Sequence, residues 1–348
     1  VDVTNVGDRL IPDLRLVDGV PPALAVVDGS PRLGSVLWPD QQVRFQYTVE
    51  MIRGEHSFGE TTVIARNWSG TAEIEYSTTV DDTIRCIPKL DPVMDSFPLR
   101  NQTVEHAGRV TTDVGGSGIE FHSTREYQHG DPLKRINWHR RAKTGEFTTI
   151  QFREERAATV ALVIDARDDA YVTDDEDVSG VEHSLRAARI IAPALLQQSN
   201  NVGVASFGPE WSWLKPGQGR GHRAQLRETL ATADGFSPVP SSDRYLPRHT
   251  IRRLRQHLPG DSQVIVLSPV ADDYIVTSLR RIEAYGHAVT LVSPDVTSDA
   301  ETPGGTIATL ERDERLRMIR QTGIRVVDWD PEEPLQVAID NAKRRWSR

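Results

Sequence analysis

The sequence predicts a multi-domain protein in which an N-terminal immunoglobulin-like β-sandwich precedes an α/β doubly wound domain. Over residues 1–88, short alternating apolar runs are separated by turn residues, which is typical of a sandwich of short strands. Over residues 159–348, short apolar runs alternate with longer segments of helical period, which is typical of a parallel sheet covered by helices. A chain of 348 residues has enough material for both domains.

The first domain is expected to consist of strands alone. Breakers such as Asp28-Gly29 and Ser69-Gly70 separate its alternating runs, and none of the runs has a helical period. The segment carries no cluster of His, Cys or carboxylate residues, so we interpret it as a spacer or docking module. The expected strands are Leu14–Val17, Ala25–Val27, Val43–Val49, Thr61–Ala65 and Ala72–Tyr76.

A connecting region is expected over residues 89–158. It begins with polar sequence, passes through the glycine-rich stretch 115–118 and then becomes dense in charged and aromatic residues. Gly130-Asp131-Pro132 is a turn signature that joins two extended pieces, so the region predicts linking hairpins. The arginines here either pair with neighbouring carboxylates or present a surface for the acidic groups of a partner.

The α/β domain is expected to place its ligands in the loops after residues 164, 207, 267 and 292, where its parallel strands end. The predicted strands are Val160–Ile164, Val202–Phe207, Val264–Leu267, Val289–Val292 and Ile324–Val327. The predicted helices are Val181–Gln198, Arg223–Ala233, Thr250–Leu258, Ile275–Tyr285, Leu310–Gln321 and Leu335–Trp346.

The composition excludes several classes of protein. The formal charge of −9 argues against binding of nucleic acid as the main task, and no run approaches the ~18 apolar residues of a membrane span. The single cysteine, Cys86, cannot form an intramolecular disulfide, which indicates a reducing compartment. Lysine occurs only five times among 41 basic residues, and an acidic surface poor in lysine suits a halophilic cytoplasm. High-GC codon bias is the alternative explanation for the arginines.

The run from Gly118 to Lys143 resembles the signature of the DUF58 family. The matching positions keep their order and spacing, and the resemblance continues to the C-terminal region. They are Glu120, Phe121, Arg125, Tyr127, Gly130, Asp131, Arg135, Ile136, Trp138, Ala142 and Lys143.

Membership of this family implies a von Willebrand factor A-like domain after the signature, and the composition suggests a member of haloarchaeal type. It also implies a membrane-associated, non-enzymatic scaffold that is accessory to a MoxR-type AAA+ ATPase in protein-complex maturation or envelope function. The expected partners are that ATPase and an unknown client protein. The expected location is the cytoplasmic face of the cell membrane, with an anchoring segment upstream of residue 1 and absent from this chain. The sequence opens on Val1 in mid-pattern, which is where such a segment would join.

The resemblance suggests a partner-binding surface and no catalytic residues. We assign partner binding to the charged and aromatic positions of the signature, which are Glu120, Arg125, Tyr127, Asp131, Arg135 and Trp138. An alternative hypothesis is a hydrolase with Glu120, Glu126 and Asp131 as acid and base. The interleaved arginines argue against it, because they would keep these carboxylates ionised.

The same resemblance raises the question of a metal site. A-type domains hold a divalent cation with the pattern Asp-x-Ser-x-Ser after the first strand, but the stretch from Asp165 to Asp169 lacks both serines and carries Arg167. A degenerate site for Mg²⁺ or Ca²⁺ is expected to use Asp165, Asp169, Ser268 and Asp272. The alternative function is therefore a metal-dependent adhesion module that binds a client carboxylate. The opposing interpretation is that backbone amides or Arg167 satisfy Asp165.

Overall fold

The computed structural model divides into two compact units, residues 1–100 with 159–348 and residues 101–158, which we describe separately. It describes residues 1–79, 82–90, 93–94, 96–100, 120–128, 136–153, 157–173, 178–243, 245–297 and 302–346.

The N-terminal part of the first unit is β-rich, as the sequence predicts. Its main sheet is antiparallel in the order β4-β2-β8-β9, and three further pairs are β1-β5, β3-β6 and β7-β10. A small core lies on one face of the main sheet, where Leu14, Leu16, Leu37 and Val63 are buried. The strands are β1 (Asp2–Thr4), β2 (Ile11–Gly19), β3 (Val26–Gly29), β4 (Arg32–Leu37), β5 (Gln42–Arg44), β6 (Tyr47–Val49), β7 (Gly54–Ser57), β8 (Gly59–Arg66), β9 (Glu73–Thr78) and β10 (Thr83–Cys86).

One predicted strand of this region is divided in the structure. The run Val43–Val49 forms two strands, β5 and β6, because β5 pairs with β1 whereas β6 pairs with β3. Strand β4 lies outside every run that the sequence singled out. It pairs with β2 through Leu33 and Leu37, whose side chains face the small core.

The C-terminal part of the first unit is an α/β region with a mixed sheet. Its strands are β13 (Thr159–Asp165), β14 (Asn201–Phe207), β15 (Trp213–Gly217), β16 (Gln263–Leu267), β17 (Ala288–Pro294) and β18 (Arg325–Trp329). Its helices are η2 (Asp168–Tyr171), α2 (Gly180–Gln197), α3 (Arg220–Thr232), η3 (Asp234–Phe236), α4 (Pro247–His257), α5 (Asp273–Ala284), α6 (Pro303–Gln321) and α7 (Leu335–Trp346).

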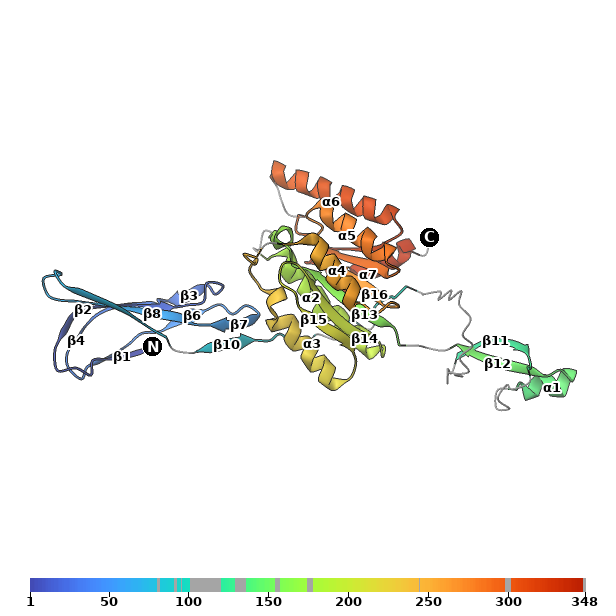
Figure 1. Ribbon diagram of the computed structural model, residues 1–348, viewed down its shortest axis with the longest axis horizontal. Helices are drawn as coiled ribbons and strands as arrows, with labels where there is room; N and C mark the ends of the chain where they lie inside the picture. Colours follow the sequence, from blue (N-terminus) through green and yellow to red (C-terminus); the bar gives the residue numbers. More distant parts are fainter. Residues whose placement is uncertain are drawn as a thin grey trace. The chain divides into compact units, whose positions relative to one another are not determined.

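The sheet order is β15-β14-β13-β16-β17-β18, and every neighbouring pair is parallel except β14 with β15. Strands β13 and β16 are parallel neighbours (Figure 1). The chain runs outward from β13 in both directions, to β14 on one side and to β16 on the other, so the loops after β13 and β16 begin at the same edge of the sheet. That edge is where the sequence predicts ligands. Strand β15 was not predicted; its half-buried residues on the outer edge of the sheet give only a weak apolar signal.

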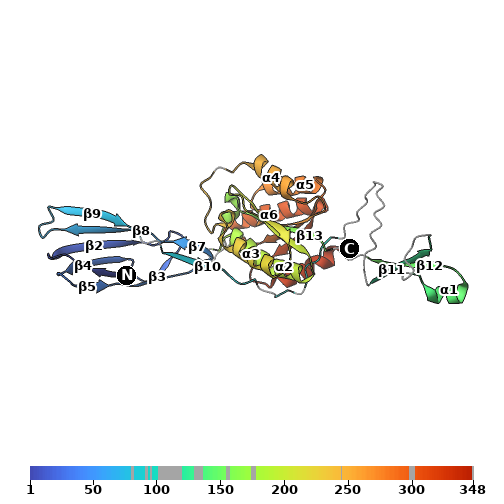
Figure 2. The same ribbon diagram turned by 60° about the horizontal axis from the view of Figure 1, so that its bottom comes forward.

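Helices cover both faces of this sheet (Figure 2). Apolar residues of α4, α5 and α6 pack on one face in a single buried cluster that includes Leu254, Leu279 and Leu316. Helices α2 and α7 pack against strands of the sheet as well, and α3 contacts α2. Successive residues of a strand point to opposite faces of the sheet. Because helices cover both faces here, a central strand such as Val160–Ile164 is apolar at every position.

Helix α6 begins at Pro303, earlier than the predicted Leu310. Thr302 caps it, because its Oγ1 accepts a hydrogen bond from the Gly305 amide at 3.0 Å, and Pro303 takes the first helical position. Gly304 and Gly305 follow, and because glycine has a low helix propensity, the sequence does not indicate a helix at this point. This first turn lies at the edge of the sheet where the sequence predicts ligands.

The second unit contains an antiparallel pair of strands, β11 (Glu120–Glu126) and β12 (Thr148–Arg153), and the helix α1 (Trp138–Thr144). The turn expected at residues 130–132 lies outside the described residues, and Ile136 forms a β-bridge with Thr149 just before α1 begins. Asn137 accepts a hydrogen bond from the Arg140 amide at 3.0 Å and starts a helix there, and Gly145 ends it with a left-handed backbone at φ 79°.

None of the helices in the described ranges is long and apolar enough to cross a membrane.

Candidate functional site

Three sequence-predicted residues come together where β13 and β16 end. Asp165 is the last residue of β13, Ser268 follows the last residue of β16, and Asp272 caps the N-terminus of α5. A buried guanidinium, that of Arg167, lies between the two carboxylates. We call Asp165, Arg167, Ser268 and Asp272 the strand-end cluster.

Arg167 makes four side-chain hydrogen bonds to the two carboxylates. Its Nε and Nη2 donate to the two oxygens of Asp165, both at 2.8 Å. Its Nη1 and Nη2 donate to the two oxygens of Asp272, at 2.9 and 2.8 Å. Ser268 Oγ donates to Asp165 Oδ2 at 2.7 Å, which gives that oxygen a second donor. Such paired bonds from one planar fork are the strongest kind of arginine–carboxylate contact.

Burial and aromatic neighbours hold the guanidinium in place. The side chains of Arg167 and Asp165 are 3% and 1% exposed, and the Phe207 and Tyr274 rings lie 5.5 and 5.6 Å from the guanidinium carbon. Burial by itself lowers the pKa of Arg167, but Asp165 and Asp272 outweigh it and raise the pKa above the ordinary 12.5. Arg167 therefore stays protonated.

The pKa of Asp272 shifts the other way. Burial raises the pKa of this carboxyl, but the hydrogen bonds and positive charge of Arg167 outweigh burial, so the net pKa lies below the ordinary 3.8. The amides of Tyr274 and Ile275 add to this lowering. Asp272 is therefore ionised near neutral pH, and its carboxylate accepts the hydrogen bonds of Arg167.

The expected metal site does not fit this arrangement. The carboxylates of Asp165 and Asp272, two of its four proposed ligands, are occupied by Arg167, whose positive charge replaces that of a cation. Asp169 points to the surface, with a side chain 60% exposed and 3.9 Å from Arg167 Nη1. In the described ranges, no group of three or more His, Cys, Asp or Glu residues is arranged to hold a metal ion. The physical reason is that a buried guanidinium and a divalent cation cannot share one pair of carboxylates.

The second unit presents a different surface on α1. Trp138 is 56% exposed at the start of this helix, and His139, Arg140 and Lys143 are exposed on it. We call Trp138, His139, Arg140 and Lys143 the α1 surface. It combines a large amphipathic ring with basic side chains, and tryptophan and arginine are two of the residue types enriched at protein-binding hot spots.

Tyr127 packs against Phe147 in the second unit. Its amide donates to the Phe147 carbonyl at 3.0 Å, and the two rings lie 5.8 Å apart. The guanidinium of Arg141 lies over the Phe147 ring at 3.3 Å. The two predicted partner-binding aromatics differ in exposure, because Tyr127 is half-buried whereas Trp138 is exposed.

Of the other four predicted partner-binding residues, two lie in a described strand and two lie outside the described residues. Glu120 and Arg125 lie in β11, where their backbones pair with Arg153 and Thr149 of β12. Asp131 and Arg135 lie outside the described residues.

Sequence reasoning missed a second buried arginine at the same edge of the sheet. Arg312 of α6 has a side chain 4% exposed and contacts Asp295 at 3.3 Å and Asp328 at 2.8 Å. It also donates to the Ser293 hydroxyl at 3.0 Å. The available signal was two aspartates near the ends of predicted strands. Asp295 directly follows β17 and Asp328 is the last residue but one of β18.

Comparisons with known proteins identify one family. A family profile described as "Protein of unknown function DUF58" matches residues 123–330, which is more than half of the chain. A similar curated protein is the uncharacterized protein YeaD of Bacillus subtilis, 24% identical over 295 residues. That match covers 83% of this chain and 67% of YeaD.

Similar solved structures are only distant. The pilus adhesin SpaC of Lactobacillus rhamnosus GG matches with a TM-score of 0.33 and 8% identity, over 56% of this chain and 30% of its own. The pilus adhesin RrgA of Streptococcus pneumoniae matches with a TM-score of 0.23 and 9% identity, over 76% of this chain and 41% of its own. The chain thus spans less than half of either adhesin.

Proposed function

Because this chain belongs to the DUF58 family, we propose that it is a non-enzymatic scaffold that acts as an accessory to a MoxR-type AAA+ ATPase and binds a client protein. In this proposal the protein takes part in protein-complex maturation or envelope function. The identity of the ATPase partner rests on the family resemblance, and the binding role rests on the molecule itself.

The observation that carries the proposal is the α1 surface. An exposed tryptophan is costly to leave in water and is enriched at the centres of protein interfaces. The basic side chains around Trp138 suit an acidic patch on the ATPase, because complementary charge speeds association and selects the partner. The α1 surface is therefore the proposed docking site for the ATPase.

The strand-end cluster supports a role without catalysis. Its two carboxylates are held by Arg167 in ion pairs, and a carboxylate fixed in this way is a poor proton donor or acceptor near neutral pH. A nucleophile with a base and an orienting group is not seen at the ends of β13, β14, β16 and β17 within the described residues.

Two finer fold assignments belong to the proposal. The sheet order, with its reversal at β13 and its antiparallel edge strand, supports a von Willebrand factor A-like domain over residues 159–348. The packing of Val3 and Val43 over the buried face of the main N-terminal sheet supports an immunoglobulin-like sandwich in residues 1–88.

The cellular setting is also proposed. The family resemblance supports a protein held at the cytoplasmic face of the membrane by a segment outside this chain. The low lysine content and the charge of −9 support a halophilic source. Fractionation of cells that express the complete gene tests the first idea, and unfolding measured against salt concentration tests the second.

A binding experiment tests the proposed function. The full chain is immobilised, and the MoxR-type ATPase of the same organism is titrated over it in the salt at which both proteins are folded. The variant Trp138→Ala should weaken binding at least about tenfold, as expected for a hot-spot residue. The control is Trp68→Ala, since Trp68 is 79% exposed but lies in the N-terminal β-rich region.

Binding that is absent in the wild type, or unchanged by Trp138→Ala, contradicts the proposal. A second variant, Arg140→Glu, reverses one charge of the α1 surface without removing the ring. It should slow association, and this effect should shrink as salt is added.

A further inference from the structure

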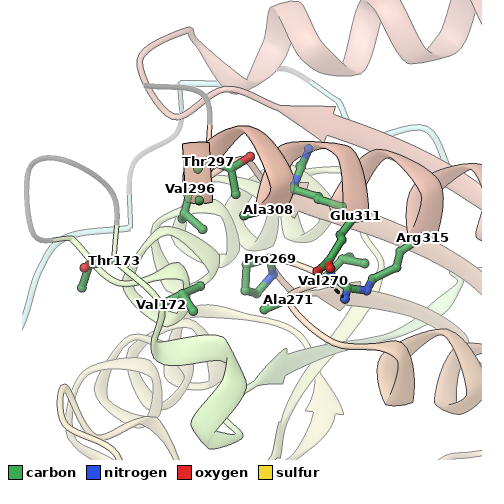
Figure 3. A pocket seen from close by; sticks show the side chains of 13 residues that line it. Val172, Thr173, Pro269, Val270, Ala271, Val296, Thr297, Ala308, Glu311 and Arg315 are labelled. Atoms are coloured by element: carbon green, nitrogen blue, oxygen red, sulfur yellow. Dashed lines mark hydrogen bonds and ion pairs between the residues drawn. The ribbon is translucent and has the colours of Figure 1, made fainter. Parts of the chain in front are cut away.

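An apolar pocket of about 310 Å³ lies beside the strand-end cluster (Figure 3). The loops after β13, β16 and β17 form one side of it, and the first turns of α6 form the other. A volume of this size is at the lower end of the range for specific ligand sites. It suits one large apolar side chain.

The walls of the pocket are mostly apolar and partly strained. Val172, Pro269, Val270, Val296 and Ala308 line it. Val270 has φ at 60°, a left-handed backbone that is rare for a β-branched residue. Such strain persists where the surrounding structure enforces it, and it is concentrated at binding and active sites. The Val270 amide is held by Ser268 Oγ at 3.2 Å, so the pocket wall and the strand-end cluster share one loop.

A second pocket, of about 250 Å³, is acidic and is linked to the first through Arg312. Asp295, Asp328, Asp330 and Glu333 line it, together with Arg345. Arg312 connects the two pockets, because it lines the apolar one and its guanidinium pairs with Asp295 and Asp328 of the acidic one.

The charges of the two pockets do not balance. Their walls carry five carboxylates and the three guanidinium groups of Arg312, Arg315 and Arg345, and Arg320 pairs with Asp328 from outside the pockets. Within the described residues, Asp330 and Glu333 of the acidic pocket have no ion-pair partner. Arg315 is already paired with Glu311 and with Asp273. The remaining negative charge favours a cationic ligand and disfavours an anionic one.

Arg312 has one polar atom that is left unpaired. Its Nε is a buried donor without a hydrogen-bond acceptor, although the side chain is 4% exposed. A buried donor of this kind is costly when it is left unpaired.

We propose that the two pockets bind a segment of the client protein in which an apolar side chain stands next to a basic one. The apolar side chain fills the pocket beside Val270 and Ala308, and the basic side chain pairs with the carboxylates beside α7. This inference rests on the proposed scaffold function and names the chemistry of the client segment.

A peptide titration tests this inference directly. The probe is a fluorophore-labelled acetyl-Gly-Arg-Leu-Arg-Gly-amide, and its anisotropy is followed as the full chain is added. One control peptide replaces Leu with Gly, and the other replaces both Arg with Glu. Each control should bind at least about tenfold more weakly than the probe. The first lacks the apolar side chain for the apolar pocket, and the second lacks the basic side chains for the acidic pocket.

Two variants locate the binding. Ala308→Trp fills the apolar pocket, and its matched control is Ile307→Trp, since Ile307 is exposed on the same helix outside the pocket. Glu333→Gln removes one charge of the acidic pocket, and its matched control is Glu314→Gln, on the exposed surface of α6. Ala308→Trp should weaken probe binding about tenfold or more and Glu333→Gln a few-fold, while both controls stay within about twofold of the wild type.

The inference is overturned if the Glu-containing peptide binds as well as the probe, or if neither Ala308→Trp nor Glu333→Gln weakens binding. Glu333 is exposed, so its variant tests the site even if Ala308→Trp fails to fold. Titration of the ATPase against the same variants separates the two proposals. Retained ATPase binding without probe binding rejects the pocket alone, whereas probe binding without ATPase binding rejects the ATPase partnership alone.

Discussion

At the scale of the residue, Arg167 decides the chemistry of the strand-end cluster. A loop that carries Asp165 and faces Asp272 has the anionic character of a cation site, and the chain fills it with its own guanidinium. Taking these charges out of water is expensive, and only complete pairing compensates for that cost. The cluster is therefore a fixed structural feature whose parts depend on one another.

The first prediction concerns the loss of this cation. Arg167→Ala leaves Asp165 buried beside Asp272 without a positive charge, so the free energy of unfolding should fall by about 3–5 kcal/mol. Urea unfolding followed by fluorescence measures this change. Arg317→Ala removes an exposed ion pair with Glu314 and should cost at most about 1 kcal/mol. Equal losses for the two variants would mean that the cluster is not specially stabilising.

A second prediction concerns metals. Mg²⁺ or Ca²⁺ should leave the melting temperature of the wild type unchanged in salt-matched buffer, because Arg167 already occupies the carboxylates. In Arg167→Ser the same oxygens are free, together with the new hydroxyl, and a divalent cation should raise the melting temperature. A metal-linked shift in the wild type would show that Arg167 can leave the cluster.

The third prediction concerns pH. The pKa of Asp272 is lowered in the folded state, so the stability it contributes is fully present above the ordinary carboxyl pKa of 3.8. That contribution is lost as pH falls through 3.8 toward the lower pKa of the folded state. Asp272→Asn should remove this part of the acid sensitivity, so its free energy of unfolding should depend less steeply on pH below about 4.

Urea unfolding at a series of pH values measures this slope. Asp273→Asn is the control, because Asp273 is the next residue and its side chain is mostly exposed. A wild type and an Asp272→Asn variant with parallel pH profiles would contradict the assignment.

At the scale of the element, close packing fixes the loops beside the apolar pocket. Gly180 begins α2, and a Cβ there would lie 2.7 Å from Pro269 and 2.9 Å from the Ala170 carbonyl. Pro269 lines the apolar pocket and Ala170 belongs to η2, which follows Arg167. The start of α2 thus positions the loops after both β13 and β16.

The fourth prediction tests this close approach. Gly180→Ala should lower the free energy of unfolding by about 1–3 kcal/mol, because an added methyl group has no room there. Gly221→Ala is the matched control in α3, where nothing lies within 4 Å of an added Cβ. There the better helix propensity of alanine should give a gain of up to about 1 kcal/mol. A stabilised Gly180→Ala variant would show that α2 can move away from Pro269.

At the scale of the whole molecule, Arg53 joins the N-terminal β-rich part to the α/β part of the first unit. Its side chain is 2% exposed and pairs with Glu182 of α2, and it also donates to the Phe236 carbonyl. Burial lowers the pKa of Arg53, and the opposing effect of Glu182 does not fully restore it. A buried charge is costly unless it stays paired. Arg53 therefore holds the N-terminal part against α2 and the Phe236 carbonyl.

The fifth prediction follows from this junction. Arg53→Ala should uncouple the two parts, so calorimetry should show separate unfolding transitions or a wider spacing between them than in the wild type. Arg85→Ala is the control, because Arg85 also pairs across the junction with Glu228 but is half exposed. A single unchanged transition in Arg53→Ala would show that other contacts couple the parts.

Sequence patterns predicted the elements of the α/β part well and the N-terminal strands in part. Buried strands such as Val160–Ile164 and the helix Leu335–Trp346 have strong periodicity, which needs no knowledge of their neighbours. The helix Trp138–Thr144 was not predicted, because a seven-residue helix depends on its Asn137 cap more than on periodicity. Strand β15 depends on its pairing with β14, which no local pattern reveals.

The sequence by itself determined that β-rich and α/β parts follow one another, that the signature is of the DUF58 type, and that Asp165 lies at a strand end. Only the tertiary structure decided what neutralises that carboxylate. Arg167 and Asp272 are 105 residues apart, and the parallel pairing of β13 with β16 brings their loops together. The direction of one long side chain then decides between a metal site and an ion pair, and packing against Phe207 and Tyr274 sets that direction.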